Sequence, residues 1–289
     1  MQAQIHAPRT GYAYNLLDNS DFRNPINQRG ASTYSGDFTY SIDRWQLGNG
    51  GAQIYVISDG LKISNATGAG DYIFQRLERL PPGNYTFAAK FRDNTGAASL
   101  TNYSTDQGVT LAPTSYADSG VLVLTFSNGE DLDSTFAYYR LQNTTPGAVC
   151  TWEWAALYEG EYTADTLPPY QPKGYGAELA ECRRYFIRTT GNAIFVGAGS
   201  EDTSTVRCYI PTGGPMRMTV PSVSPASGLS VSVRVHTGVY NATDATAAVA
   251  STDSNGVLLR LTSANQIING QYALAAVCIN TPLSISADL

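Results

Sequence analysis

The chain has 289 residues, of which 43% are hydrophobic and only 15% are charged, and its formal net charge is −6. An average soluble domain carries about 25% charged residues, so much of the polar surface must come from uncharged side chains. A protein that binds nucleic acid presents a basic face to the phosphates, which this acidic composition disfavours. The apolar runs have the length of strands and are too short to cross a bilayer. We therefore expect neither nucleic-acid binding nor membrane insertion.

The first half of the chain is predicted to be an arm followed by a β-sandwich. Residues 1–14 contain no periodic apolar pattern, and we expect an extended arm there. Residues 15–172 alternate short apolar runs with turn residues, which is typical of an antiparallel sandwich. Asp59-Gly60 is a two-residue signal for a type I′ hairpin between two of these runs. The predicted strands are residues 52–58, 61–64, 84–91, 121–126, 136–141 and 150–158.

Two tryptophans, Trp152 and Trp154, lie two residues apart in the last of these strands. Strict alternation predicts that both point to one face and that Glu153 points to the other. This separation argues against a carboxylate that acts beside sugar-stacking rings. We expect both tryptophans and Trp45 to pack in the core.

A joint follows the predicted sandwich. Prolines precede residues 173–190, which are predicted to be a linker and one short helix over residues 177–186. Residues 191–289 are again β-rich and are predicted to form a second domain. The sequence thus predicts an all-β chain, with two antiparallel β-sandwich domains joined by a short α-helix. The strands expected in the second domain are residues 193–198, 206–211, 229–235, 257–262 and 271–279.

Catalytic motifs are absent from the sequence. It contains no GxSxG, HExxH, P-loop or complete GxGxxG pattern, and its only histidines are His6 and His236. We therefore expect no enzyme and no cofactor, with a carboxylate-based glycan hydrolase as an alternative. Glu130, Asp131 and Asp133 crowd one turn, which we interpret as an exposed acidic turn, with Ca²⁺ binding as the alternative. The cysteines lie far apart and are expected to be unbridged.

The aromatic residues are the best binding candidates, since the chain has 19 tyrosines and 3 tryptophans. Tyrosine rings give glycan or protein ligands a large contact area at little cost in rotamer freedom. Several tyrosines, Tyr175 among them, lie in or beside turn-rich segments. The predicted ligand-binding residues are Tyr103, Tyr116, Tyr138, Tyr139 and Tyr170.

Several segments stand out as motifs: Asn15–Gly30 (NLLDNSDFRNPINQRG) with Ile42–Trp45 (IDRW), Glu178–Phe186 (ELAECRRYF), and Pro215-Met216-Arg217 with Pro221. They resemble segments of bacteriophage tail-fibre and related virion proteins. In that family the last interval is one residue shorter. The resemblance implies a jelly-roll-like first domain similar to carbohydrate-binding modules, and a homotrimer. It carries over no active-site residue, and we expect Asn15–Asn19 and Arg44-Trp45 to fix the sandwich rather than to touch a ligand.

The leading hypothesis is a tail-fibre or receptor-binding component that attaches to a bacterial-surface glycan. Its expected partners are itself, other virion proteins and that glycan. Residues 1–4 lack the features of a signal peptide, so we expect synthesis in the host cytoplasm and a final location in the virion, in the tail. A capsid, head-fibre or baseplate protein without a receptor of its own is the alternative.

Overall fold

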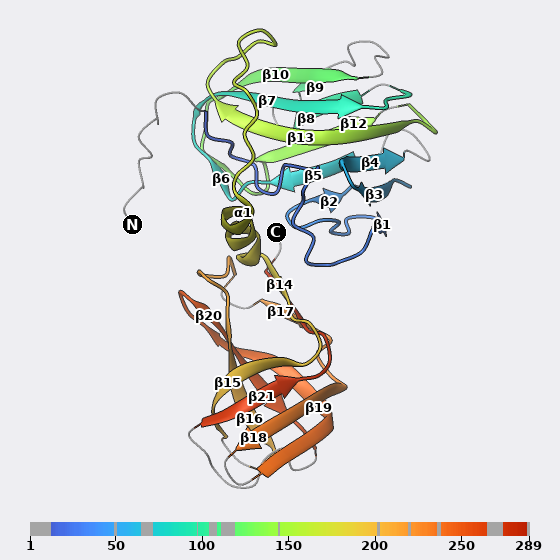
Figure 1. Cartoon of the computed structure of the whole chain (residues 1–289). Coiled ribbons are helices and arrows are strands. Elements are labelled where there is room, and N and C mark those ends of the chain that lie inside the picture. Colours follow the sequence, from blue (N-terminus) through green and yellow to red (C-terminus); the bar gives the residue numbers. More distant parts are fainter. Residues whose placement is uncertain are drawn as a thin grey trace. The chain divides into compact units, whose positions relative to one another are not determined.

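The computed structural model describes residues 13–48, 51–64, 72–96, 98–103, 109–110, 119–143, 145–200, 203–218, 221–235, 238–264 and 274–287. The chain divides into two compact units, Met1–Glu178 and Leu179–Leu289. Strands dominate both units, and the described residues contain one helix (Figure 1). The prediction of an all-β chain with antiparallel sheets is confirmed.

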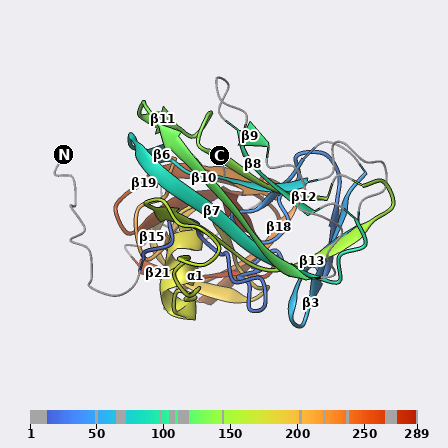
Figure 2. The same ribbon diagram turned by 90° about the horizontal axis from the view of Figure 1, so that it is seen from above.

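The first unit is a sandwich of a six-stranded and a five-stranded antiparallel sheet. In the first sheet, β13, β7 and β10 run side by side (Figure 2). The six-stranded sheet has the order β1 (Thr33–Ser35), β3 (Gln53–Ile57), β4 (Gly60–Ser64), β13 (Val149–Glu159), β7 (Gly83–Arg92) and β10 (Gly120–Asn128). The five-stranded sheet has the order β2 (Gln46–Leu47), β5 (Tyr72–Arg76), β12 (Tyr138–Asn143), β8 (Ala98–Tyr103) and β9 (Val109–Thr110). A separate pair consists of β6 (Arg79–Leu80) and β11 (Leu132–Asp133).

The core of this unit lies between the two sheets. Tyr85, Phe87, Ala89 and Phe91 of β7 all face it, as their alternation predicts. Trp45 and other large side chains pack against them and are fully buried. The large apolar residues of alternating strands therefore define the inner face of each sheet.

A β-bulge in β13 changes which face its tryptophans occupy. The register of β13 against β7 shifts between Trp152 and Trp154. Trp152 packs in the core, whereas Trp154 joins Ala88 and Ala156 on the outer face, the face turned away from the five-stranded sheet. Glu153 pairs there with Lys90. The prediction that both tryptophans share a face, opposite Glu153, is wrong because a bulge inserts an unpaired residue.

The hairpin between β3 and β4 forms where the sequence predicts it, but its turn lies one residue earlier. Ile57 pairs with Gly60, so the two loop residues are Ser58 and Asp59. Gly60 does not have a positive φ and is needed for another reason. A Cβ atom on Gly60 would lie 2.8 Å from the carbonyl oxygen of Trp152 and 2.7 Å from Thr151 Cγ2.

The second unit contains a closed six-stranded barrel, where the sequence predicts a sandwich. The barrel order is β15 (Ala193–Ser200), β16 (Thr205–Pro211), β20 (Gly256–Thr262), β19 (Gly238–Thr252), β18 (Leu229–Val235) and β21 (Leu274–Ile279). Branched side chains fill its interior, as expected for so small a barrel, among them Val231, Leu259 and Ile279. A small sheet has the order β14 (Phe186–Arg188), β22 (Ser284–Ser286) and β17 (Ser222–Ser224).

The helix α1 (Tyr175–Arg183) begins and ends earlier than predicted. Phe186 belongs to β14, because it pairs with Ser286 of β22. The boundary between the units falls inside the helix, after Glu178. This position lies within residues 173–190, the segment that the sequence predicts as linker and short helix. Residues 1–12 of the predicted arm lie outside the described residues, while Ala13 packs against the outer face.

We predict that Gly60→Ala lowers the free energy of unfolding by about 1–3 kcal/mol, because the new methyl group overpacks against backbone that cannot move away. Gly129→Ala is the matched control, since a Cβ atom there meets nothing within 4 Å. Urea unfolding of both variants measures the difference. Equal stability of the two variants would contradict the account of Gly60.

Candidate functional site

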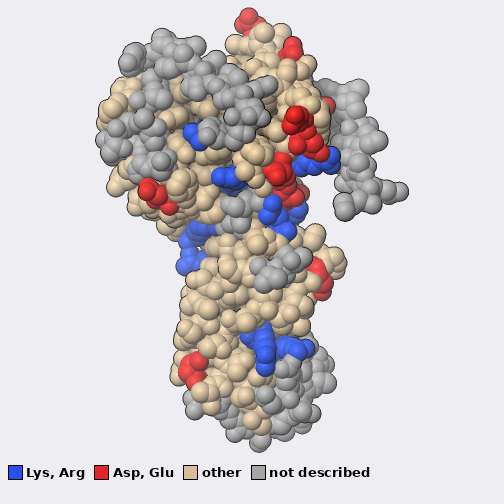
Figure 3. All heavy atoms as spheres, turned by 180° about the vertical axis from the view of Figure 1, so that it is seen from behind, with Lys and Arg blue, Asp and Glu red and all other residues tan. Residues whose placement is uncertain are grey.

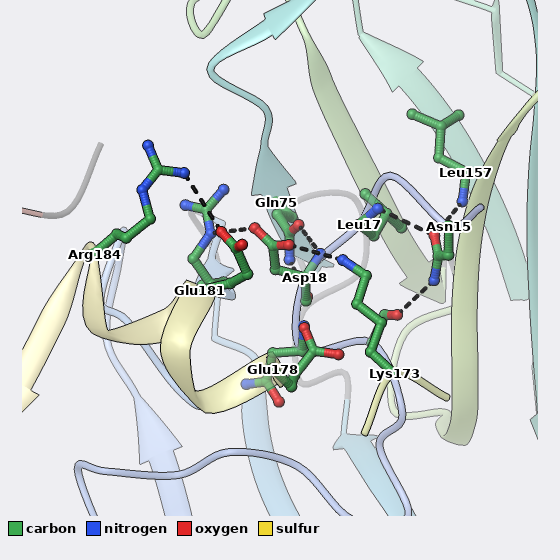
Figure 4. A network of polar contacts seen from close by, with 12 residues as sticks. Asn15, Leu17, Asp18, Gln75, Leu157, Lys173, Glu178, Glu181 and Arg184 are labelled. Atoms are coloured by element: carbon green, nitrogen blue, oxygen red, sulfur yellow. Dashed lines mark hydrogen bonds and ion pairs between the residues drawn. The ribbon is translucent and has the colours of Figure 1, made fainter. Parts of the chain in front are cut away.

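A buried polar network ties the start of the sandwich to the middle of the chain (Figure 4). The amide nitrogen of Asn15 donates hydrogen bonds to Ser20 Oγ at 2.8 Å and to the carbonyl of Ala155 at 3.1 Å. Its side-chain oxygen accepts bonds from the backbone nitrogens of Leu17 and Leu157. Asn15 thereby satisfies backbone groups of two segments at once, which an apolar side chain could not do.

The carboxylate of Asp18 lies between two cations. Lys173 Nζ is 3.0 Å from one oxygen and Arg44 Nε is 3.2 Å from the other. Burial alone would raise the pKa of Asp18, but the charges of Lys173 and Arg44 outweigh it and lower that pKa below its usual value. Arg44 also donates to the carbonyl of Arg76, and Gln75 bonds both backbone groups of Asp18. The pair with Lys173 fixes residues near 173 against residues near 18.

Asn19 continues this network in a left-handed conformation, with φ of 50°. Its side chain bonds the backbone of Ile26 and of Asp43, and its carbonyl accepts from Trp45 Nε1 at 2.9 Å. Its backbone nitrogen donates to the Glu178 carboxylate. These bonds agree with the prediction that Asn15–Asn19 and Arg44-Trp45 fix the sandwich.

The two segments joined by this network enclose a hollow of about 270 Å³ within the first unit. We call it the Tyr175 hollow. This volume is close to the lower end of typical ligand pockets, about 300 Å³. Its floor is formed by Asn19 and Ile26, which are buried. Its walls are Asp21, Asn24, Pro172, Lys173, Gly174, Tyr175 and Glu178.

The Tyr175 hollow combines an aromatic ring with polar groups of several kinds. Tyr175 is 56% exposed, although large hydrophobic side chains are generally buried in this unit. Asp21 supplies carboxylate oxygens and Asn24 supplies an amide that both donates and accepts. A ring face beside donors and acceptors is the arrangement that suits a ligand with both an apolar face and hydroxyl groups.

An aromatic stack adjoins the Tyr175 hollow on the outer face. The rings of Trp154 and Tyr170 are parallel within 6°, with centroids 4.7 Å apart. The Arg23 guanidinium lies 5.8 Å from the Tyr170 centroid and its Nε is 2.8 Å from Asp21. The hydrogen bond that Arg23 donates to Asp21 raises the pKa of Arg23. Burial raises the pKa of Tyr170, so its hydroxyl stays protonated at neutral pH.

The structure separates the tyrosines that the sequence proposes as ligand-binding residues. Tyr170 lies beside the Tyr175 hollow, as described above. Tyr139 is fully buried in the core, and Tyr138 packs with Tyr72 and Phe74 on the outer side of the five-stranded sheet, where it is only 4% exposed. Neither ring presents a face to a ligand. Tyr116 and the Tyr103 side chain lie outside the described residues.

The acidic turn does not form a metal site in the described residues. Asp131 is held by Nε and Nη2 of Arg79, and Asp133 accepts a bond from the backbone nitrogen of Thr135. Glu130 is exposed, and no three potential metal-ligating side chains gather anywhere in the described part of the chain. Both histidines fall outside that part. All four cysteines are free, as predicted.

The residues that line the Tyr175 hollow, except Tyr175, were not singled out from the sequence as binding candidates. Asp21 and Asn24 belong to the segment that carries the family resemblance, which we interpreted as purely structural. Lys173 was assigned to a linker. The sequence signal that could have found them is the position of Tyr175 between Gly174 and Gly176. Small neighbours on both sides leave an aromatic ring accessible.

Comparison with known proteins finds solved structures at low similarity. No protein-family model and no curated protein sequence matches the chain. A putative sugar-binding protein from Bacteroides thetaiotaomicron aligns with 51% of this chain and 100% of its own, at 11% identity and a TM-score of 0.33. The tandem CBM22-1–CBM22-2 domain of Paenibacillus barcinonensis Xyn10C aligns with 97% of this chain and 100% of its own, at 10% identity and a TM-score of 0.34.

A more distant match is the structure of Sulfolobus Turreted Icosahedral Virus, with 11% identity, a TM-score of 0.18, and coverage of 82% of this chain and 63% of that one. Matches with TM-scores of this size do not establish a shared fold. Among the described residues, no helix is long and apolar enough to cross a membrane. The functional proposal below therefore rests on the residues of the Tyr175 hollow and not on these matches.

We predict that Asp18→Asn lowers the free energy of unfolding by about 3–5 kcal/mol at pH 7, because it leaves the buried Arg44 and the partly buried Lys173 without the carboxylate that they share. The folded-state pKa of Asp18 lies below the ordinary value of an aspartate. Its contribution is therefore complete above that value and is lost as the pH falls through the folded-state pKa. Urea unfolding of the wild type should show this acid loss, and the variant should show less of it.

The matched control for this prediction is Asp131→Asn, which breaks an ion pair whose side chains are 45% and 68% exposed. We expect little change from it, since water screens an exposed pair. Equal destabilisation by the two substitutions, or an unaltered pH dependence in Asp18→Asn, would refute the role assigned to Asp18.

Proposed function

We propose that this chain is a bacteriophage virion protein, a tail-fibre or receptor-binding component, which binds a bacterial-surface glycan in the Tyr175 hollow. The observation that carries the proposal is the exposed Tyr175 ring beside Asp21 and Asn24. A sugar ring has an apolar face that packs on an aromatic ring and hydroxyl groups that both donate and accept hydrogen bonds. The virion assignment comes from the sequence segments that resemble tail-fibre proteins.

The proposed role is binding without catalysis. A glycosidase needs one carboxyl group that donates a proton and another that acts as base or nucleophile. Asp21 is paired with Arg23, and one oxygen of Glu178 accepts a bond from the backbone of Asn19. Both carboxylates of the hollow are thus engaged with groups of the protein itself.

Self-association is part of the same proposal. The family resemblance implies a homotrimer, and the second unit has exposed apolar side chains on its barrel wall. Ile194 of β15 is 71% exposed and Val239 of β19 is 50% exposed. Exposed apolar side chains are often covered when protein surfaces associate. The trimer stays a prediction.

We predict that the purified chain binds oligosaccharides on an array of bacterial-surface glycans and that Tyr175→Ala weakens this binding about tenfold, which corresponds to about 1.4 kcal/mol. Phe38→Ala is the control, because Phe38 is also aromatic, is 52% exposed and does not line the Tyr175 hollow. Mass spectrometry of the bound glycan should show no cleavage. Binding that survives Tyr175→Ala unchanged would exclude this hollow as the site.

We also predict that antibodies against the chain label the tail of the virion in immunogold electron microscopy. The tail is the expected position because a receptor-binding component must reach the host surface first. Preabsorbing the antibody with purified chain should remove the label. Label on the capsid instead would favour the alternative of a structural head or head-fibre protein.

A further inference from the structure

We propose that the Tyr175 hollow is one end of a longer track on the outer face of the six-stranded sheet, and that this track holds an extended, electrically neutral glycan chain. The inference rests on the proposed glycan-binding function. It adds the ligand class, namely an internal stretch of a polysaccharide rather than a single terminal sugar.

A second recess lies on the same outer face. We call it the polar groove, and its volume is about 700 Å³. Lys90 and Arg92 of β7 point into it from the outer face, since the alternating residues Ala89 and Phe91 face the core. Glu153 enters from the bulge of β13. The rim includes Asp93, Asn94 and Ser119.

Strand pairing places the groove and the Tyr175 hollow next to each other. Asp21 forms a β-bridge with Trp154, and Trp154 pairs with Lys90. The three residues therefore form one row across neighbouring strands and share the outer face. Adjacent strands lie about 4.8 Å apart, so the backbone at Asp21 and at Lys90 is separated by about 10 Å. Asp21 lines the hollow and Lys90 lines the groove, so the gap between the two sites is small.

The residues between the two recesses also suit a sugar chain. The parallel stack of Trp154 and Tyr170 lies in the middle of the row, and Tyr170 is partly exposed. Arg23 bonds Asp21 at the hollow, and the charge of Glu153 at the groove contributes to the raised pKa of Arg23, after the larger effect of Asp21. Arg23 is thus close enough to both recesses to interact electrostatically with each.

The charges along the track cancel. Its four cations are Arg23, Lys90, Arg92 and Lys173, and its four carboxylates are Asp21, Glu153, Asp93 and Glu178. These cations are held by carboxylates: Arg23 by Asp21 at 2.8 Å, Lys90 by Glu153 at 3.0 Å, Lys173 by Asp18 at 3.0 Å, and Arg92 by Asp93 and by Asp59.

This pairing decides the ligand class. A polyanionic chain would have to displace a carboxylate from each cation before it gained an ion pair of its own. A neutral chain can hydrogen-bond to the outer lone pairs and N–H groups of the existing pairs, because hydrogen bonds to charged groups are stronger than those between neutral groups. The track therefore favours neutral hydroxyl-rich chains over chains of uronic or sialic acids.

The test uses the full chain and fragments of a neutral O-antigen polysaccharide. The polysaccharide comes from a bacterial strain whose cells are labelled when the chain binds to them. The fragments run from single sugars to about six units, and oligogalacturonates of the same lengths form the anionic series. Isothermal titration should show affinity that rises with the length of the neutral fragments. Oligogalacturonates of the same lengths should bind at least about tenfold more weakly, a difference of about 1.4 kcal/mol.

Lys90→Gln should weaken binding of the long neutral fragments about fivefold and leave the shortest one unchanged, because only long fragments reach the polar groove. Arg79→Gln is the matched control, since it also removes a cation from an ion pair of the first unit, at a position outside both recesses. Tyr175→Ala should weaken short and long fragments alike.

Three results would overturn the inference. Affinity that does not depend on length, or a Lys90→Gln variant that binds long fragments like the wild type, would limit binding to the Tyr175 hollow and leave the proposed function standing. Tighter binding of oligogalacturonates would reverse the ligand class. If no strain is labelled and no fragment of any length binds, the proposed function itself fails.

Discussion

The contact on which the candidate site depends is the ion pair between Asp18 and Lys173. These residues lie far apart in the sequence, and their charged atoms are 3.0 Å apart in the folded chain. A buried carboxylate is stable only with such partners, so the two segments must meet for either to be buried. Their meeting places Asp21 and Asn24 opposite Tyr175 and creates the hollow. The same bonds that hold the sandwich closed therefore determine where a ligand can enter.

The second determinant is the bulge in β13. Without it, Trp154 would follow Trp152 into the core. Glu153 would then be the only one of these three residues on the outer face. The additional residue turns Trp154 outward, where Tyr170 stacks on it, while Glu153 stays on that face with Lys90. One backbone irregularity thus brings an aromatic stack and a charged pair together. Residue alternation cannot predict a bulge, because the prediction assumes that successive side chains alternate between faces and a bulge interrupts that alternation.

How far the fold could be predicted depended on side-chain size. The strand around Tyr85 and Phe87 was predicted because large residues alternate there. The longest strand, β19, was missed because its inward residues are small, such as Ala242, Ala245 and Ala247. Barrel closure was also missed, since it depends on the pairing of β15 with β21, which are distant in the sequence. Residue type did not separate the tyrosines either, because a tyrosine ring fills a core as readily as it faces a ligand.

The scarcity of charge acquires a structural meaning at the outer face. Only 15% of the residues are charged, yet eight charged residues gather along the track. Most of the described surface visible in Figure 3 is uncharged. Isolated charges there would attract ions of one sign, whereas matched pairs create a surface that is strongly polar and carries no net charge. Such a surface offers many hydrogen-bond donors and acceptors without preferring either sign of ligand charge. That combination suits a ligand whose polarity is high and whose charge is zero, which is the defining chemistry of a neutral polysaccharide.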